Sequence, residues 1–345
     1  MTVKYELKEN AAILTLTRER YLNTLTLEMI EKIDKYLRNI AKNKNIHMVI
    51  FKGEGKKSFC AGGDVKSFYE EKYKNTNILR KNFFYKEYKL NYLIRKYNKP
   101  IISLVNGICM GGGVGIAMHS NLTIVSENVT FAMPETAIGL FPDVGSGYIL
   151  SKIKDNIGIY LGLTGKRLNS SDLIELKLAD YCIQYEDFEK IENLLVKIKT
   201  KTSIRKIIKK YAIRTDSLLF PSLNKNISQT FKYKSVEDII SSLKTFKEKW
   251  AVEALGALEK NSPTSLKITL KQINLAKNLS LRDELIMEYR LSQACMAGVD
   301  FYEGVRSVLV DKDFNAKWSP KLLKDVDNKL VLLHFKPLGK DDLTI

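Results

Sequence analysis

The chain has 345 residues, 45% of them hydrophobic, which is enough for one large domain with an appendage or for two domains with a core each. No apolar run reaches the roughly 18 residues that a membrane span requires. The N-terminal segment lacks the basic-then-apolar order of a signal peptide and the Arg-rich character of a transit peptide. We therefore expect a cytoplasmic protein whose fold begins at its first residues.

The net charge of +17 comes from 56 Lys and Arg residues against 39 Asp and Glu residues. A charge of this size can attract nucleic acid, an anionic membrane or an anionic cofactor. The basic residues are spread along the chain and alternate with apolar positions, as they do on solvated helix faces. Because charge alone does not specify a site, we expect neither a nucleic-acid partner nor a membrane partner.

The four cysteines are Cys60, Cys109, Cys182 and Cys295. They are far apart in the sequence, and none forms a C-x-x-C pair. This spacing predicts buried free thiols rather than disulfides or a structural zinc site.

The first part of the chain alternates between strand and helix patterns. Strands are expected at 3–8, 11–17, 47–52, 100–105, 122–125 and 130–132, and helices at 26–40 and 75–97. Thr26 is suited to cap the first of these helices. This order indicates an α/β core with largely parallel strands.

From about residue 184 onward, Lys-rich helical patterns dominate. Ser262 with Pro263, and Ser280 with Asp283, are typical of helix starts. We place an α/β core at 1–185 and a helical C-terminal region at 186–345.

Three short stretches combine glycine with acidic residues, at 59–64, 107–115 and 133–145. The first two directly follow expected strands. Glycine in such a turn lets the backbone approach a ligand and direct its N–H groups toward it. Two such loops side by side can supply two N–H donors to one oxygen, which is an oxyanion hole.

The third stretch holds Glu135 and Asp143, eight residues apart across a turn bounded by prolines. When two carboxyl groups lie close together in a site that excludes most water, their pKa values move apart. One group can then act as a base and the other as an acid. Each feature also has an ordinary explanation. A glycine turn is often only a tight connection, Asp143 is suited to cap a helix, and Glu135 is suited to a first helical turn.

Other catalytic motifs fail on inspection. The segment 113–118 lacks the third glycine of a dinucleotide fingerprint, and Gly165 with Lys166 lacks the upstream glycine of a P-loop. There is no G-x-S-x-G elbow and no His/Cys cluster with metal spacing. These failures point away from nucleotide, metal and serine-nucleophile chemistry.

Taken together, the three stretches resemble the enoyl-CoA hydratase/isomerase (crotonase) superfamily, and within it the 3-hydroxyisobutyryl-CoA hydrolase branch. The resemblance is carried by the segments 132–145 and 287–296 and by the acidic and basic positions between 300 and 313. It extends from residue 3 to the C-terminus and is faint between about 185 and 260. It implies an α/β fold of the ClpP/crotonase type, a spiral of ββα units, with a helical C-terminal region that completes the acyl-CoA site.

The resemblance also implies roles for individual residues. Gly63 and Gly112 match the two oxyanion-hole amides, and Glu135 matches the catalytic glutamate of the superfamily. Asp143 falls where hydrolases of this branch have an aspartate and hydratases usually have glycine. Gly115 falls where hydratases carry a second catalytic glutamate, which argues against water addition to a double bond.

The substrate contacts are implied in the same way. Glu87 matches a substrate-contacting glutamate, and Ala61 and Asp64, on either side of the first oxyanion glycines, are expected to line the substrate site. Arg20 and Lys312 are expected near the phosphates of the coenzyme. Coenzyme A is part of the substrate, and neither a metal nor another cofactor is expected.

The implied reaction is hydrolysis of 3-hydroxyisobutyryl-CoA to 3-hydroxyisobutyrate and free coenzyme A, a step of valine breakdown. Glu135 would either activate water or attack directly to form a mixed anhydride, and the sequence leaves both open. Relatives of this fold often assemble as trimers or hexamers, so the resemblance implies such an assembly unless the longer C-terminal part of this chain covers the contact surface. Two alternatives remain: a hydratase or isomerase of the same fold, and a basic nucleic-acid or membrane-surface binding protein on a non-catalytic crotonase fold.

Overall fold

The computed structural model describes residues 2–74, 77–198, 201–215 and 219–345. The chain forms two units, each built from separate segments. Unit 1 consists of residues 1–63, 89–131 and 167–221, and unit 2 consists of residues 64–88, 132–166 and 222–345. Residue 185, where the sequence indicates the change to a helical region, lies inside unit 1, and the division at that point stays a prediction.

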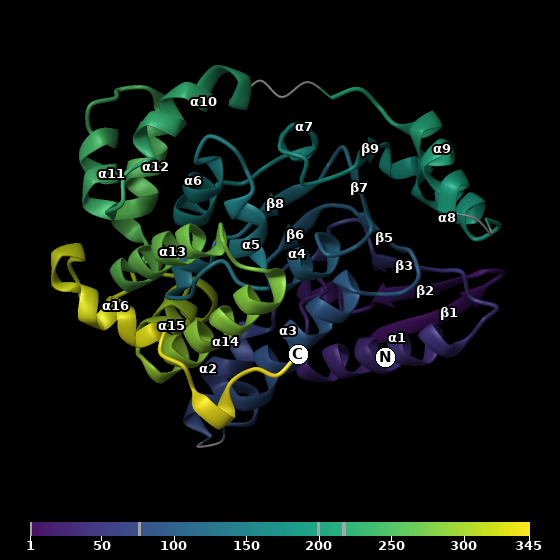
Figure 1. Ribbon diagram of the computed structural model, residues 1–345, viewed down its shortest axis with the longest axis horizontal. Helices are drawn as coiled ribbons and strands as arrows, with labels where there is room; N and C mark the ends of the chain where they lie inside the picture. The colour runs from purple at the N-terminus through teal and green to yellow at the C-terminus, as the bar shows by residue number, and fades with distance from the viewer. Residues whose placement is uncertain (1, 75–76, 199–200, 216–218) are drawn as a thin grey trace. The chain divides into compact units, whose positions relative to one another are not determined.

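Unit 1 contains a six-stranded sheet in the order β1-β2-β3-β5-β7-β9 (Figure 1). Its strands are β1 Val3–Lys8, β2 Ala11–Leu16, β3 Met48–Gly53, β5 Ile101–Val105, β7 Leu122–Ser126 and β9 Tyr181–Ile183. β1 pairs antiparallel with β2, and every later neighbouring pair is parallel. Every residue of β5 and β7 is buried, because a parallel strand is covered on both faces. The prediction of largely parallel strands is confirmed.

A second, smaller sheet has the order β4-β6-β8. Its strands are β4 Ser58–Cys60, β6 Ile108–Met110 and β8 Thr130–Ala132. Each follows a strand of the large sheet after a few residues, and each is followed by a helical segment. These segments are α2 Val65–Tyr73, α4 Gly112–Ala117 and the 3-10 helix η2 Glu135–Ile138. The order of long strand, short strand and helix thus occurs three times, which is the expected succession of ββα units.

Unit 1 also contains helices. They are α1 Leu27–Lys42, α4, α7 Ser170–Glu175, α8 Phe188–Leu195 and α9 Lys201–Tyr211, with 3-10 turns at Glu19–Tyr21 and Tyr185–Asp187. The Thr26 side chain accepts a hydrogen bond from the Met29 amide and caps α1, as predicted. The helix expected at 75–97 is α3 Ile78–Arg95, which runs from unit 2 into unit 1, and residues 75–76 lie outside the described residues.

The core of unit 1 lies between the large sheet and helices α8 and α9, which lie beside β9 (Figure 1). The sheet contributes Ile13, Ile50 and Ile102, all fully buried. The helices contribute Ile191 and Leu195 to the same cluster. Full burial of one such side chain typically contributes about 1.5 to 3 kcal/mol.

Unit 2 consists mainly of helices. They are α2, α5 Ser146–Ser151, α6 Ile157–Thr164, α11 Val236–Leu243, α12 Lys249–Lys260, α13 Pro263–Ala276, α14 Leu281–Ala297, α15 Asp300–Val305 and α16 Asn328–His334. The helix α10 Leu219–Thr230 begins in unit 1 and continues in unit 2. Shorter helical turns occur at η2, Arg306–Val310, Leu323–Asp325 and Gly339–Asp341.

Helix α13 occupies the interior of unit 2, where it packs against α5, α6 and α16. Ten of its 14 residues are buried, so it has no face that is polar throughout. Pro263 is its first residue, and the Ser262 side chain accepts a hydrogen bond from the Ser265 amide. Ser280 caps α14 through the Asp283 amide. Both helix starts expected from the sequence are confirmed.

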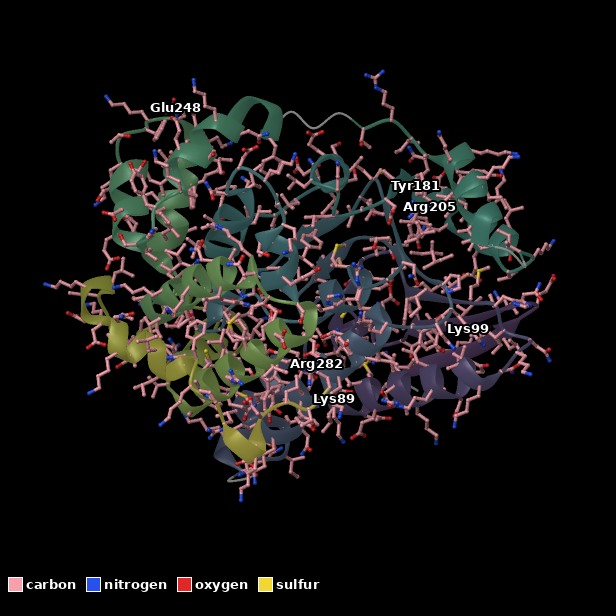
Figure 2. All side chains as sticks on the ribbon, viewed as in Figure 1. Lys89, Lys99, Tyr181, Arg205, Glu248 and Arg282 are labelled. Atoms are coloured by element: carbon pink, nitrogen blue, oxygen red, sulfur yellow. The ribbon has the colours of Figure 1, made fainter. Side chains whose placement is uncertain are left out.

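The basic side chains are distributed over many elements, and several contact acids. Arg205 pairs with Asp180 at 3.2 Å and lies next to Tyr181 (Figure 2). Lys8 and Lys52 both donate to the buried Glu192 carboxylate. Exposed pairs such as the first contribute at most about 1 kcal/mol each, so these charges do not explain how the fold is held together.

Two further expectations concern the whole chain. Of the residues that the structure describes, none belongs to a helix long and apolar enough to cross a membrane. All four cysteines are buried and none forms a disulfide, which confirms the prediction of buried thiols.

Candidate active site

The two glycine-rich loops of unit 1 lie against each other. A Cβ atom built on Gly62 would lie 3.9 Å from the Gly111 Cα atom and 4.0 Å from the Gly112 nitrogen. The strands that precede the loops, β4 and β6, are paired neighbours in the small sheet. The loops therefore lie side by side, as an oxyanion hole requires, and the assignment of the Gly63 and Gly112 amides to that role stays a prediction.

The first of these loops is anchored by the segment that precedes α1. The Leu25 amide donates to the Gly62 carbonyl at 2.8 Å, and the Ala61 amide donates to the Leu22 carbonyl at 3.0 Å. Gly63 forms an isolated β-bridge with Leu25. Gly62 has a φ of +107°, a conformation that L-residues rarely adopt, so glycine is required there. Unit 1 thus holds the loop on its own backbone.

Unit 2 brings together three carboxyl groups predicted from the sequence. Glu135 is the first residue of η2, Asp143 lies in the loop before α5, and Glu87 lies on α3. Their exposed fractions are 6%, 4% and 2%. Asp143 is not a helix cap, because the N-cap of α5 is Gly145. Glu135 does lie in the first turn of a helix. An acid that only favours the helix dipole is usually exposed, whereas the Glu135 side chain is buried.

Two glycines fix the position of η2 by letting α15 approach its backbone. A Cβ atom on Gly139 would lie 2.3 Å from the Asp300 carbonyl carbon, and one on Gly304 would lie 2.4 Å from the Ile138 carbonyl carbon. Gly139 also has a φ of +71°, which ends η2. These contacts leave no room for larger residues, so the Glu135 backbone is held by close packing with α15.

Burial raises the pKa values of all three acids. Burial first, and then the charge of Asp143, raises the pKa of Glu135 and of Glu87 well above the usual value of 4.5. Burial raises the pKa of Asp143 from 3.8 to about 7, and the hydrogen bond from Tyr88 opposes this rise. The Tyr88 hydroxyl donates to Asp143 Oδ2 at 2.9 Å. Near neutral pH such a cluster can both accept and donate protons.

Glu135 and Glu87, whose pKa values are raised, each have one carboxyl oxygen that is available to bind a ligand. Glu135 Oε2 and Glu87 Oε1 are buried and have no hydrogen-bond partner among the described residues. A buried carboxyl oxygen without a partner is costly in a folded protein and therefore indicates a group that binds water or a substrate.

Four further polar residues near Asp143 are buried and were not predicted from the sequence: Tyr88, Gln272, Glu284 and Glu288. Gln272 lies on α13, and the two glutamates lie on α14. A signal for the glutamates was present, since positions 284 and 288 share a helix face with Leu281 and Leu285, which carry the apolar pattern of α14.

The other predicted site residues lie apart from these carboxyl groups in the chain. Arg20 is exposed on the 3-10 turn Glu19–Tyr21 of unit 1. Lys312 is exposed in unit 2 and has a φ of +57°. Asp64 is the N-cap residue of α2 without a side-chain capping bond. Coenzyme binding by Arg20 and Lys312, and substrate contacts by Ala61 and Asp64, stay predictions.

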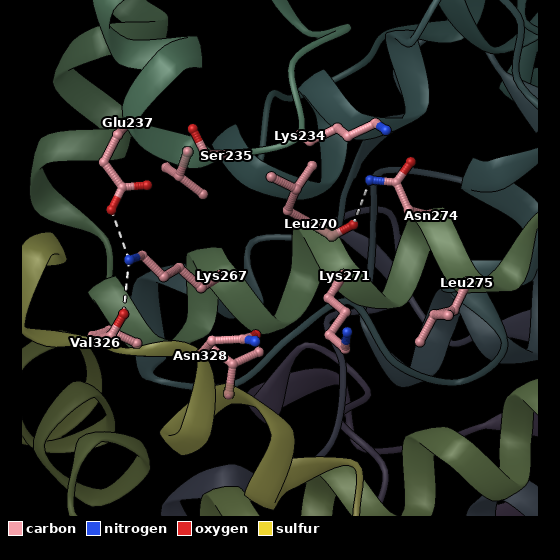
Figure 3. A pocket seen from close by; sticks show the side chains of 12 residues that line it. Lys234, Ser235, Glu237, Lys267, Leu270, Lys271, Asn274, Leu275, Val326 and Asn328 are labelled. Atoms are coloured by element: carbon pink, nitrogen blue, oxygen red, sulfur yellow. Dashed lines mark hydrogen bonds and ion pairs between the residues drawn. The ribbon is translucent and has the colours of Figure 1, made fainter.

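Unit 2 also contains a cavity of about 490 Å³ lined by α11, α13 and the segment 326–331 (Figure 3). Lys267, one of the lysines that line the cavity, already has partners within the protein. Its Nζ pairs with Glu237 at 2.6 Å and donates to the Val326 carbonyl at 2.7 Å. None of its lining residues is one of the predicted site residues. We assign it no catalytic role.

Relatives of this chain are 3-hydroxyisobutyryl-CoA hydrolases. The Xenopus tropicalis protein of that name is 42% identical over 342 residues, which is 97% of this chain and 89% of the relative. The Homo sapiens protein of that name is 41% identical over 348 residues, which is 99% of this chain and 90% of the relative. Both names include the word mitochondrial. The expectation of a cytoplasmic protein is therefore wrong, since it rested only on the absence of a recognisable transit pattern.

Solved structures with the same fold have related names. An enoyl-CoA hydratase from Rhodobacter sphaeroides is 32% identical, with a TM-score of 0.91 and complete coverage of both chains. A carnitinyl-CoA dehydratase from Mycobacterium thermoresistibile is 31% identical, with a TM-score of 0.93 over 99% of this chain and 98% of the other. The expected crotonase-type fold is confirmed.

The family model described as enoyl-CoA hydratase/isomerase matches residues 11–335. This range includes both glycine loops of unit 1 and the carboxyl groups of unit 2. The resemblance drawn from the sequence motifs is thus confirmed over nearly the whole chain. The chain belongs to the enoyl-CoA hydratase/isomerase family.

Proposed function

We propose that this protein is an acyl-CoA thioester hydrolase that converts 3-hydroxyisobutyryl-CoA and water to 3-hydroxyisobutyrate and free coenzyme A, a step of valine breakdown. The observation that carries the proposal is the buried Glu135 carboxyl, which has a free oxygen and a raised pKa beside Asp143. The hydrolase names of relatives 41% and 42% identical to this chain support the choice of reaction.

In the proposed mechanism, the amides of Gly63 and Gly112 donate hydrogen bonds to the thioester oxygen. Negative charge develops on this oxygen as the carbonyl carbon becomes tetrahedral, so the two donors stabilise the transition state more than the substrate. Removal of one such donor typically costs about 3 kcal/mol. The side-by-side arrangement of the two loops in unit 1 supports this role.

Glu135 is the group that acts on water or on the thioester. As a general base it takes a proton from water while the water oxygen attacks the carbonyl carbon. As a nucleophile it forms a mixed anhydride, which water then hydrolyses. A base works best when its pKa is near the working pH, and burial shifts Glu135 in that direction.

Asp143 and Glu87 complete the proposed site. Asp143, held by Tyr88, orients Glu135 or the substrate and can return a proton to the departing thiolate. Glu87 offers its free oxygen to the hydroxyl group of the acyl chain. A site that hydrogen-bonds a substrate hydroxyl strongly rejects acyl groups that lack it, because a buried polar group is then left without a partner.

Hydration of a double bond is the second candidate, and the names of the two solved structures favour it. Hydratases use a second carboxylate at the position of Gly115. In this chain Gly115 is a buried residue of α4, and it brings no carboxyl group to the site. We therefore rank thioester hydrolysis above hydration.

The test is release of free thiol from 3-hydroxyisobutyryl-CoA, measured with a thiol reagent for the wild type and for Glu135→Gln. Loss of a general acid or base typically lowers the rate by about 10²- to 10⁴-fold, and we expect a loss in that range. Glu192→Gln is the matched control, since it removes a buried glutamate of unit 1 outside the proposed site.

Hydration of crotonyl-CoA is measured in parallel. Hydration without thiol release would replace the hydrolase by a hydratase. No reaction with either thioester would favour the basic binding protein, which predicts a salt-sensitive complex with nucleic acid or anionic vesicles.

The names of the relatives bear on the compartment of the protein, and the family resemblance bears on its assembly. The relatives are named mitochondrial, and we propose that the reaction takes place in mitochondria. Subcellular fractionation with an antibody against this chain tests the proposal. The trimer or hexamer implied by the crotonase resemblance stays a prediction, which light scattering of the purified protein tests.

A further inference from the structure

Three buried residues of unit 2 form a polar cluster behind the Asp143 loop. The Gln272 side-chain nitrogen lies 3.2 Å from Glu284 Oε1, 3.1 Å from Glu288 Oε1 and 2.8 Å from the Pro142 carbonyl oxygen. All three side chains are fully buried. One amide nitrogen therefore connects both glutamates to the backbone of the residue that precedes Asp143.

Glu288 also binds the loop on the other side of Asp143. Its Oε2 accepts a hydrogen bond from the Gly145 amide at 2.7 Å, and its Oε1 accepts from the Gly147 amide at 3.4 Å. Glu284 accepts a backbone hydrogen bond from Tyr148, which lies in α5 beyond the loop, and a Cβ atom on Gly147 would lie only 2.2 Å from its Oε1. Asp143 is thus bracketed by backbone groups that Gln272 and Glu288 hold.

Glu284 and Glu288 lie close together without a positively charged side chain beside them among the described residues. Among the described residues, neither Glu284 nor Glu288 forms an ion pair with a Lys, Arg or His. Burial first, and then the charge of Glu284, raises the pKa of Glu288 well above its usual value, and burial raises that of Glu284 to about 7. The two buried carboxyls therefore bind protons in a coupled way.

We propose that Glu288, linked to Glu284 through Gln272, is a positioning residue that holds the Pro142–Gly145 loop and the first turn of α5, so that Asp143 lies where the reaction requires it. This inference rests on the proposed thioester hydrolysis, because it assigns Glu288 a task in that reaction. Glu288 does not touch the reacting atoms in this role. It acts through the backbone on both sides of Asp143.

The matched variants Glu288→Gln and Glu284→Gln separate this role from simple space filling. The Glu288 carboxylate accepts hydrogen bonds from three N–H donors, which belong to Gly145, Gly147 and Gln272. A glutamine at 288 has only one acceptor oxygen, so its NH₂ group must face at least one of these donors. A glutamine at 284 keeps one acceptor oxygen for the Gln272 and Tyr148 donors and carries no charge.

The experiment measures kcat and KM of both variants with 3-hydroxyisobutyryl-CoA, and hydrogen–deuterium exchange of the peptide that contains residues 143–148. A reactive group misplaced by about 1 Å can cost as much as about 100-fold in rate. For Glu288→Gln we expect kcat to fall at least about tenfold with KM within about twofold, and faster exchange in the loop. For Glu284→Gln we expect kcat and exchange within about threefold of the wild type.

Equal losses of kcat in the two variants, or unchanged kcat and exchange in Glu288→Gln, would overturn the proposal. If Glu288→Gln fails to fold, Glu284→Gln still tests the proposal. A large loss of kcat in Glu284→Gln would contradict the assignment of the positioning role to Glu288. Wild-type protein that releases no thiol would refute the proposed function instead. The exchange measurement would then still show whether Glu288 holds the loop.

Discussion

Replacement of Tyr88 by phenylalanine removes a side-chain hydrogen bond to Asp143. The Tyr88 hydroxyl donates to Asp143 Oδ2 at 2.9 Å, and both side chains are buried. The ring also packs on Phe84, with a centroid distance of 5.8 Å. Tyr88→Phe keeps this packing and removes only the donor, so its effect on Asp143 is electrostatic.

The sign and size of the effect follow from this hydrogen bond. The hydroxyl stabilises the carboxylate form, so its removal raises the pKa of Asp143 above the present value of about 7. A hydrogen bond to a charged group is worth about 1.5 to 3 kcal/mol. Since one pKa unit corresponds to about 1.4 kcal/mol, the expected rise is about 1 to 2 units.

The assay is the pH dependence of kcat/KM between about pH 5 and about pH 9.5. The groups facing Asp143 are Tyr88 and Glu87 from α3, Glu135 from η2, and Glu284, Glu288 and Cys295 from α14. Because the carboxyls among them titrate together, the profile reports values of the cluster. We expect the limb nearest pH 7 to move to higher pH in Tyr88→Phe.

Tyr85→Phe on the same helix is the control, since its hydroxyl lies 2.8 Å from Thr344 Oγ1 at an exposed site. A limb that stays in place, moves to lower pH, or moves as far in Tyr85→Phe would refute the assigned effect of Tyr88.

Two predictions concern stability. The pKa of Asp143 is raised from 3.8 to about 7 in the folded protein, so its favourable contribution is complete below about pH 4 and is lost as pH rises through 7. Asp143→Asn should therefore raise the free energy of unfolding more at pH 8 than at pH 5, by at most about 4 kcal/mol. Thermal unfolding at the two pH values measures this, and an equal gain at both would contradict it. Gly304→Ala places a Cβ atom 2.4 Å from the Ile138 carbonyl carbon and should cost about 1 to 3 kcal/mol and lower kcat. Gly256→Ala, whose Cβ meets nothing within 4 Å, is its control and should leave kcat unchanged.

The sequence predicts this fold well where local signals are strong. The expected strands at 47–52 and 100–105 correspond to β3 and β5, and their continuous apolar character reflects burial on both faces. The helix caps at Thr26, Ser262 and Ser280 were also identified, because each side chain binds an amide a few residues away. Such signals depend only on neighbouring residues.

The sequence does not predict features that depend on distant contacts. The composition of unit 2 from residues 64–88, 132–166 and 222–345 follows from packing between segments. Gln272 contacts the carbonyl of Pro142 at a separation of 130 residues, and no spacing rule connects the two. Motif resemblance could identify Glu135 and Asp143, but the residues that support them from behind became visible only in the structure.

The buried acids also bear on the alternative of a non-catalytic binding protein. Burial of carboxyl groups without cationic partners destabilises a fold, as the raised pKa values of Glu87, Glu135 and Asp143 show. A protein that bound nucleic acid through its surface lysines would gain nothing from this cost, because its buried carboxyls would not touch the ligand. Proton transfer at neutral pH requires carboxyl groups with raised pKa values and with oxygens that can bind a ligand, and this site has both. The cost in stability is therefore best explained by catalysis at Glu135.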